Sequence, residues 1–178
     1  ASSIKTLGTV ATIGAVVSLG KEAVKMADSY KLVEARLSLV TKGTLELANA
    51  QQSLFNISQN TRQSFKETAD LYASLARSTQ QLGKTQTETL RVTETINKAI
   101  IISGASAQSA QAALVQLGQG FASGTLRGEE LNSVLEQTPR IAEAIAKGMG
   151  VTIGQLRALG AEGSLTGEAV FEALQKQA

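Results

Sequence analysis

The chain has 178 residues, with 17 basic and 15 acidic side chains, a net charge of +2, no histidine and no cysteine. These absences remove the commonest general base, the serine and cysteine nucleophile systems that need histidine, ordinary zinc sites and any disulfide framework. Positive and negative residues alternate, and no cluster of Lys and Arg with interleaved aromatics suits a nucleic acid. We therefore expect no specific nucleic-acid partner, and both a cytosolic and a particle-borne protein stay open.

The apolar composition predicts a thin core. Hydrophobic residues make up 43% of the chain, but much of that share is alanine and aromatic residues reach only 3%. Because alanine buries little area, the hydrophobic stabilisation per residue is small. The composition therefore favours an elongated or oligomeric helical protein over a well-filled sphere.

The first distinctive segment is an apolar run over residues 7–19, flanked by Lys5 and Lys21. It is shorter than the roughly 17 residues that a membrane-spanning helix needs. A signal peptide is a second candidate, but no small-residue cleavage site follows the run. We interpret it as a helix that packs against others, with Gly8, Gly14 and Gly20 allowing close approach. The alternative is a membrane-perturbing module formed by residues 4–26.

Helical periodicity continues through the next segments. One helix is predicted from about residue 23 to Gly43, and a second begins near Thr44. Asn60 or Thr61 is expected to cap a third helix, which ends at Gly83. The predicted apolar stripes of these three helices are Val24, Ala27, Leu32, Ala35, Leu39 and Val40, then Leu47, Leu54, Phe55 and Ile57, then Phe65, Ala69, Tyr72 and Ala76.

Two further long helices are predicted after Gly83. Thr85 opens the first, which ends at Gly104, and Ser106 caps the second, which ends at Gly124. Gly118, Gly120 and Gly124 have the spacing GxGxxxG and follow a helix, which differs from a dinucleotide-binding motif. We expect these glycines to fray and end the helix.

Four short helices are predicted in the remainder. Thr138 is expected to cap one of them, with Pro139 at its first position. Thr152 and Gln155 match a capping box, and Thr166 precedes a further helix start. With no convincing strand pattern, the sequence predicts an all-α protein: a helical stalk or hairpin over residues 1–104, then a compact bundle of short helices over residues 105–178.

The segment GEELNSVLEQTPR carries the candidate site. Glu129, Ser133 and Glu136 share a helical face, so a carboxylate pair for peptidoglycan hydrolysis is conceivable. The favoured interpretation is that Glu129 and Glu130 offset the dipole at a helix start. We predict instead a partner contact near this turn, formed by Arg127, Glu129, Glu130, Asn132 and Arg140.

The block over residues 103–174 resembles the amino-terminal helical domain of tail tape-measure proteins from long-tailed bacteriophages and prophages. The matching residues include SGAS, AQSAQAALVQLGQGFASG and GTLRGEELNSVLEQTPRIAEAIAKGMGVTIGQLRALGAEGSLT. ADSYKLVEARLSLVT and TRQSFKETADLYASLARS are similar upstream, so the resemblance covers about residues 23–178.

The resemblance implies a structural protein that takes part in virion assembly and acts without a cofactor. Such proteins occupy the tail lumen, fix tail length by their own length and are released toward the host envelope as DNA passes. It implies contacts with tail tube protein, tail assembly chaperones and tail tip or baseplate proteins, and residence in the host cytoplasm during assembly. Separately, helices rich in Ala, Gln, Ser and Thr with thin apolar stripes suit self-association or docking on other helices. Because a measuring chain must be much longer, we expect this segment to be one domain of a longer protein.

Overall fold

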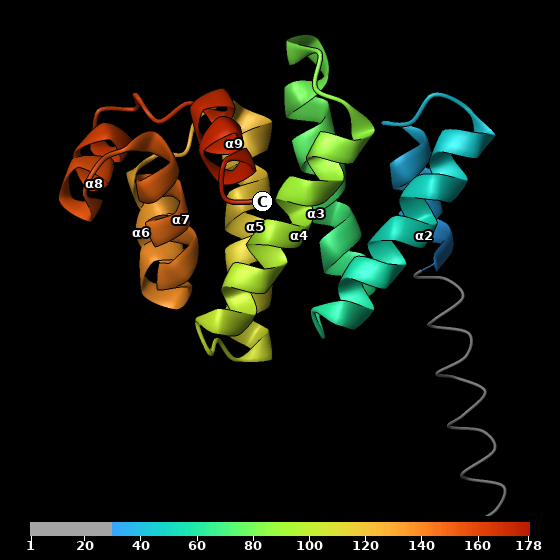
Figure 1. The fold of residues 1–178 in the computed structure, drawn as a ribbon, viewed down its shortest axis with the longest axis horizontal. Coiled ribbons are helices and arrows are strands. Elements are labelled where there is room, and N and C mark those ends of the chain that lie inside the picture. Colours follow the sequence, from blue (N-terminus) through green and yellow to red (C-terminus); the bar gives the residue numbers. More distant parts are fainter. Residues whose placement is uncertain (1–29) are drawn as a thin grey trace, which may run out of the picture.

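The computed structural model describes residues 30–178, which form an array of helices standing side by side (Figure 1). The predicted all-α fold is confirmed, and within residues 30–178 the extended pairing is limited to one isolated bridge between Thr125 and Thr166. Helical residues 30–38 come first. They are followed by α2 (Thr44–Asn60), α3 (Phe65–Thr79), η1 (Gln80–Leu82), α4 (Gln86–Ile102), α5 (Ala107–Ser123), α6 (Gly128–Gln137), α7 (Pro139–Met149), α8 (Ile153–Ala161) and α9 (Gly167–Gln175).

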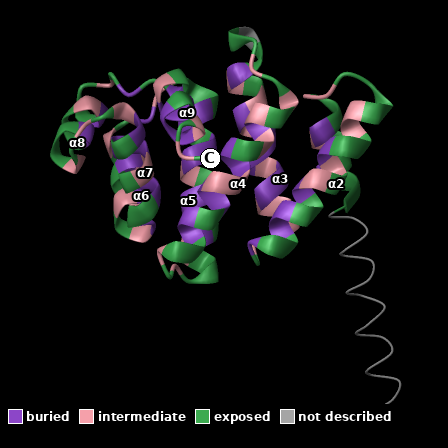
Figure 2. Cartoon of the chain, viewed as in Figure 1, coloured by how far each residue is buried: buried purple, intermediate pink, exposed green. Residues whose placement is uncertain are grey.

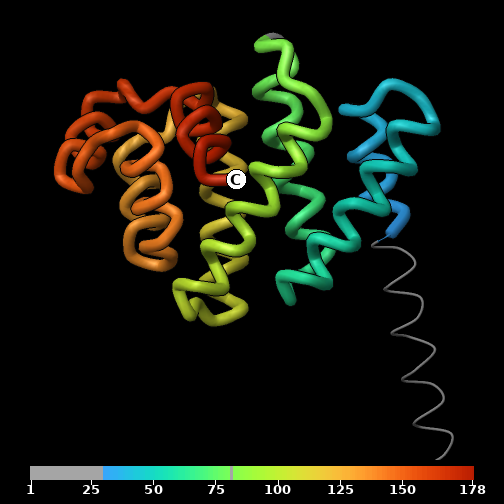
Figure 3. Tube along the Cα trace, viewed as in Figure 1, coloured from blue at the N-terminus to red at the C-terminus, as the bar shows by residue number. Residues whose placement is uncertain are grey.

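The chain path is a zigzag in which α2, α3, α4 and α5 run alternately down and up (Figure 3). These helices have 15 to 17 residues, whereas α6 to α9 have 9 to 11. The closest packing joins α3 to α5, α5 to α6 and α7 to α9. The predicted change from long to short helices is therefore present.

Most helix boundaries follow the predicted caps. The hydroxyls of Ser106 and Thr166 each accept a hydrogen bond from a backbone N–H in the first turn of their helix. Thr85 with Glu88 and Thr152 with Gln155 form complete capping boxes. Left-handed glycines also stand where chain reversals were predicted, because only glycine adopts positive φ without strain; they include Gly83, Gly104 and Gly124.

One predicted cap is wrong, and a second stands at its predicted position without a side-chain cap bond. Ser64 stands at the start of α3, whereas Thr61 ends α2 and donates its hydroxyl to the carbonyl of Ile57 at 2.6 Å. Thr138 precedes Pro139 as predicted, but its hydroxyl bonds the carbonyl of Val134 at 3.1 Å instead of capping α7. The Thr138 hydroxyl is bonded to the preceding helix and is therefore not free to cap α7. Thr61 lies three residues before Ser64, too far from α3 to cap it.

Two hydrophobic clusters hold the array together, and both lie between the helices (Figure 2). The larger, here the main cluster, draws on α3 to α9 and contains large side chains such as Leu117, Ile145 and Phe171. The smaller, here the N-terminal cluster, is formed by Val33, Leu37, Ala50, Leu54, Ile57, Ala69 and Tyr72. Leu32 and Phe55 of the predicted stripes are exposed, as is Leu39, which follows the last helical residue at position 38.

Three glycines permit close approach in the main cluster. A Cβ at Gly148 would lie 2.1 Å from the carbonyl oxygen of Ala173, and one at Gly160 would lie 2.5 Å from Leu131. Gly120 is buried inside α5, where a Cβ would lie 2.2 Å from Leu126. The prediction that Gly118 and Gly120 fray α5 is wrong, because the helix continues through both to Ser123.

The main cluster joins residues on both sides of residue 104. Leu71, Val92 and Ile96 precede that position, and they belong to the same cluster as Leu117 and Phe171. The division into domains at residues 1–104 and 105–178 stays a prediction, and packing is continuous where it would fall. Residues 4–26, the predicted membrane-perturbing segment, lie outside the described residues.

Candidate interaction surface

Four of the five predicted contact residues line one surface depression. Arg127, Glu129, Glu130 and Asn132 contribute the wall from the start of α6. The opposite wall comes from the end of α8 and the following turn, over residues 160–163. The depression therefore joins two helix ends that lie about 30 residues apart in sequence, and we call it the α6–α8 depression.

Long-range backbone contacts fix the α6 side of this depression. The N–H of Leu126 donates to the carbonyl of Leu165 at 2.8 Å, and the N–H of Gly167 donates to that of Gly124 at 2.8 Å. The Leu126 side chain is fully buried in the main cluster. Backbone hydrogen bonds and side-chain burial therefore both anchor the segment that leads into α6. Arg127 follows directly and is exposed.

The opposite wall is held by close packing. Gly160 of α8 is buried, and the Leu131 side chain of α6 fills the space where a Cβ would lie. Leu156 of α8 belongs to the main cluster and anchors the same helix. Close contact between α6 and α8 thus sets the distance between the two walls.

The depression presents both signs of charge to solvent. Glu129 and Glu130 lie in the first turn of α6, where they offset the helix dipole as predicted. Arg127 stands at the N-cap position without a side-chain cap, and its Nε lies 3.4 Å from the Thr125 hydroxyl. Within the described chain the Glu130 Oε2 atom is buried and has no hydrogen-bond partner. Such an arrangement can accept and donate hydrogen bonds to a polar partner.

The structure places Arg140 elsewhere, because α6 and its 10 residues separate Arg140 from Arg127. Its guanidinium pairs with Glu143 at 2.5 Å, and it lines a second depression with Lys98 and Lys147. Its backbone N–H donates to the Ser103 hydroxyl at 3.3 Å. Ser103 at the end of α4 therefore bonds the start of α7, where Thr138 makes no side-chain cap.

Nothing in the described geometry brings the two carboxylates of the hydrolysis hypothesis together. Glu129 lines the α6–α8 depression, whereas Glu136 lies seven residues further along α6, about 10 Å by helical rise, and does not line it. Within residues 30–178 no group of three or more acidic side chains is placed to hold a metal ion.

The displaced pKa values belong to groups at other places. Hydrogen bonds from the backbone and side chain of Thr85 and from Gln175 lower the pKa of Glu88 to about 2. Burial raises the pKa of the Tyr72 hydroxyl. Glu88 belongs to a capping box and Tyr72 to the N-terminal cluster, so both shifts have structural causes.

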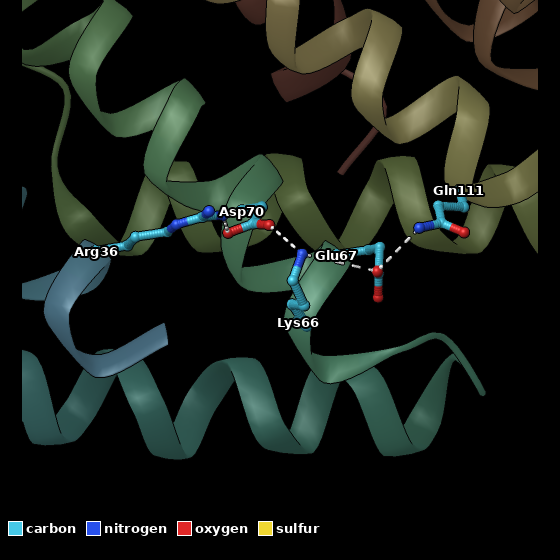
Figure 4. Close-up of polar contacts among 5 residues, drawn as sticks. All are labelled: Arg36, Lys66, Glu67, Asp70 and Gln111. Atoms are coloured by element: carbon cyan, nitrogen blue, oxygen red, sulfur yellow. Dashed lines mark hydrogen bonds and ion pairs between the residues drawn. The ribbon is translucent and has the colours of Figure 1, made fainter. Parts of the chain in front are cut away.

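A groove between α3 and α5 was missed at the sequence level. Its floor includes Leu71, Leu114 and Gly118, and its α5 rim includes Val115 and Gln119. On the α3 rim the charges are paired: Lys66 lies 2.9 Å from Asp70 and 3.9 Å from Glu67 (Figure 4). Arg36 also pairs with Asp70, and Gln111 of α5 donates to Glu67 at 3.2 Å. The sequence signal was the absence of any charged residue between Lys98 and Arg127.

The sequence matches the protein family described as "Tape measure protein" over residues 21–178. The chain belongs to the tape measure protein family. This tape measure protein is therefore a structural component of a phage tail. No curated protein and no solved structure matches its sequence.

The matched residues of this tape measure protein include every helix described above. Among these helices none combines the length and the apolar character needed to cross a bilayer. The membrane-perturbing alternative concerns residues 4–26, and neither the family nor the described fold supports it.

Proposed function

We propose that this tape measure protein acts in tail assembly and in setting tail length, without enzymatic activity. The family match over residues 21–178 carries this proposal. In the virion the protein occupies the lumen of the tail tube, and during assembly it resides in the host cytoplasm. Its partners are tail tube protein, tail assembly chaperones and tail tip or baseplate proteins.

The described fold suits partner binding better than measurement. Even a continuous helix of all 178 residues would span only about 270 Å at 1.5 Å per residue. Residues 30–178 instead fold back and forth into helices that stand side by side, so the array is shorter than that span (Figure 1). We therefore assign partner engagement to the folded array.

The α6–α8 depression is the surface that we assign to a partner. It is exposed and carries both signs of charge. It joins the ends of two helices, α6 and α8, so a partner would contact both at once.

Co-purification with a tail assembly chaperone and with tail tube protein tests this assignment. The variant Arg127→Glu with Asn132→Ala alters two exposed residues of the depression, and binding should weaken at least tenfold. Arg157→Glu is the matched control, since Arg157 is an exposed residue of α8 outside the depression. Unchanged binding of the double variant, or equal loss in the control, would contradict the assignment.

A further inference from the structure

Helix α8 is much less buried than α9, a helix of the same length. Both have nine residues, but α9 buries five of them, whereas α8 buries only Leu156 and Gly160. α8 lies at one end of the array and packs against α6 and α7 (Figure 1). Regions with few buried apolar contacts open at a lower free energy than the rest of a protein. The burial therefore indicates that α8 can open separately.

The attachment of α8 is also purely apolar. Within residues 30–178, no hydrogen bond or ion pair joins residues 152–163 to another helix. The following helix differs in this respect. Gln175 of α9 donates to Glu88 of α4 at 2.8 Å, and Lys84 lies 3.2 Å from Glu172 of α9. Opening of α8 would therefore break no polar contact with the array, whereas opening of α9 would break several.

Both ends of α8 adjoin a glycine that can act as a hinge. Gly150 ends α7 with a φ of 73°, and Gly163 follows α8 with a φ of 69°. No described atom lies within 4 Å of the place that a Cβ would take at either glycine. Two residues beyond Gly163, the carbonyl of Leu165 is held by the N–H of Leu126. The backbone can therefore turn at both glycines while the segments outside them stay in place.

We propose that α8 is a hinged lid that opens away from α6 and α7 while the rest of the array stays folded. Opening would separate the two walls of the α6–α8 depression, because residues 160–163 form one wall and the start of α6 forms the other. It would also uncover Leu131 and Leu156, which are fully buried in the closed state. Burial of these two side chains favours the closed state.

The lid gives the α6–α8 depression an assembled and a dismantled state. A partner that contacts both walls would bind only the closed state, so partner binding and lid closure would stabilise each other. This consequence rests on the proposed function. The opening itself concerns the chain alone and can be measured without any partner.

Hydrogen exchange of the unmodified chain tests the lid directly. An isolated helix of nine residues is marginal in water, so the α8 amides would exchange whenever the lid opens. We expect them to exchange at least about tenfold faster than the α9 amides, with little dependence on urea, because opening exposes little surface. Equal exchange of α8 and α9, with the urea dependence of global unfolding, would overturn the proposal.

A disulfide between α6 and α8 gives a second test, because the chain has no cysteine of its own. A Cβ at Gly160 would lie 3.6 Å from the Cβ of Leu131, within the range that disulfides span. In the variant Leu131→Cys with Gly160→Cys, oxidation should slow exchange of α8 about tenfold relative to the reduced form and leave α9 unchanged. Unaltered exchange of α8 on oxidation, or equal slowing in α9, would overturn the lid.

The same measurement with a partner separates the lid from the proposed function. Tail tube protein or a tail assembly chaperone that binds both walls should slow exchange of α8 in the unmodified chain. If neither protein binds but α8 still exchanges faster than α9, the lid is supported and the assignment of the depression to a partner is contradicted. A bound partner that leaves the exchange of α8 unaltered would contradict the coupling between closure and binding.

Discussion

The N-terminal cluster and the main cluster are built by different means. The N-terminal cluster contains seven buried residues, two of which are alanine, and it joins helical residues 30–38, α2 and α3. The main cluster contains 23 buried residues, five of which are alanine, and joins seven helices; glycines bring some of these helices into close contact. Hydrophobic stabilisation scales with the apolar area removed from water, so the N-terminal cluster should be the less stable part.

Aromatic contacts and hydrogen bonds supplement the N-terminal cluster. Tyr30 stacks on Phe65 with ring centroids 5.3 Å apart, and Phe55 meets Phe65 edge-on at 6.1 Å. Buried Asn97 of α4 donates to the hydroxyls of Thr68 at 2.9 Å and Thr61 at 3.3 Å. The comparison indicates that a few specific contacts stabilise the helices before α3, whereas buried apolar surface area stabilises the later helices.

Truncating one buried leucine in each cluster should give the largest effects. Leu117→Ala and Leu54→Ala each remove a fully buried side chain, and each should lower the free energy of unfolding by about 3 to 5 kcal/mol. Leu117→Ala should weaken the protection of backbone amides from hydrogen exchange throughout the array. Leu54→Ala should weaken this protection mainly in residues 30–60. Hydrogen exchange measures both. Equal loss of protection throughout the chain in both variants would contradict the distinction.

Adding one methyl group at Gly148 should be nearly as damaging. The new Cβ would meet the backbone of Ala173 at 2.1 to 2.6 Å, and backbone cannot move aside cheaply. Gly148→Ala should therefore cost about 3 kcal/mol in urea unfolding. Gly154→Ala is the control, because its Cβ would have only one neighbour, at 3.9 Å. If both variants unfold at the same urea concentration as the wild type, the close contact assigned between α7 and α9 is contradicted.

Asn97→Ala should have an intermediate effect. It would remove the two hydrogen bonds to Thr61 and Thr68 and leave a small cavity, which should cost about 2 kcal/mol. The Oδ1 atom of Asn97 has no partner within the described residues, which reduces what the wild-type side chain contributes. Asn49→Ala, at an exposed site of α2, should be nearly neutral. A neutral Asn97→Ala would show that these bonds add nothing.

The smallest effect concerns acid stability. The pKa of Glu88 is lowered to about 2 in the folded chain, from an ordinary value of 4.5. A lowered pKa means that ionised Glu88 stabilises the fold above about pH 4.5, and that this contribution is lost as the pH falls toward 2. Glu88→Gln should flatten that part of the pH dependence in thermal unfolding. Glu94→Gln on the same helix controls for the loss of one carboxylate, and an identical pH profile in Glu88→Gln would contradict the assignment.

Local signals explain which parts of the fold could be predicted. Thr85, Ser106, Thr152 and Thr166 act within one turn of their own helix, so the sequence alone suffices to place them. Thr61 and Thr138 could not be assigned in this way, because each can bond either to the helix behind it or to the helix ahead. The bond from Arg140 to Ser103 joins residues 37 apart and has no local signature.

The candidate site was predictable in part for the same reason. Arg127, Glu129, Glu130 and Asn132 are close in sequence and lie together at the start of α6. The second wall, formed by residues 160–163, depends on the packing of Leu131 against Gly160 and could not be seen in the sequence. Arg140 was grouped with the others by its proximity to the Thr138–Pro139 break, but the length of α6 separates it from them.

Electron microscopy of particles made without this protein tests the central claim most directly. If the gene that encodes the chain is deleted from its phage or prophage, we expect particles without tails, or with tails of irregular length. Supplying the wild-type protein from a plasmid should restore tails of uniform length. Tails of normal and uniform length in the deletion would contradict a role in tail assembly and length.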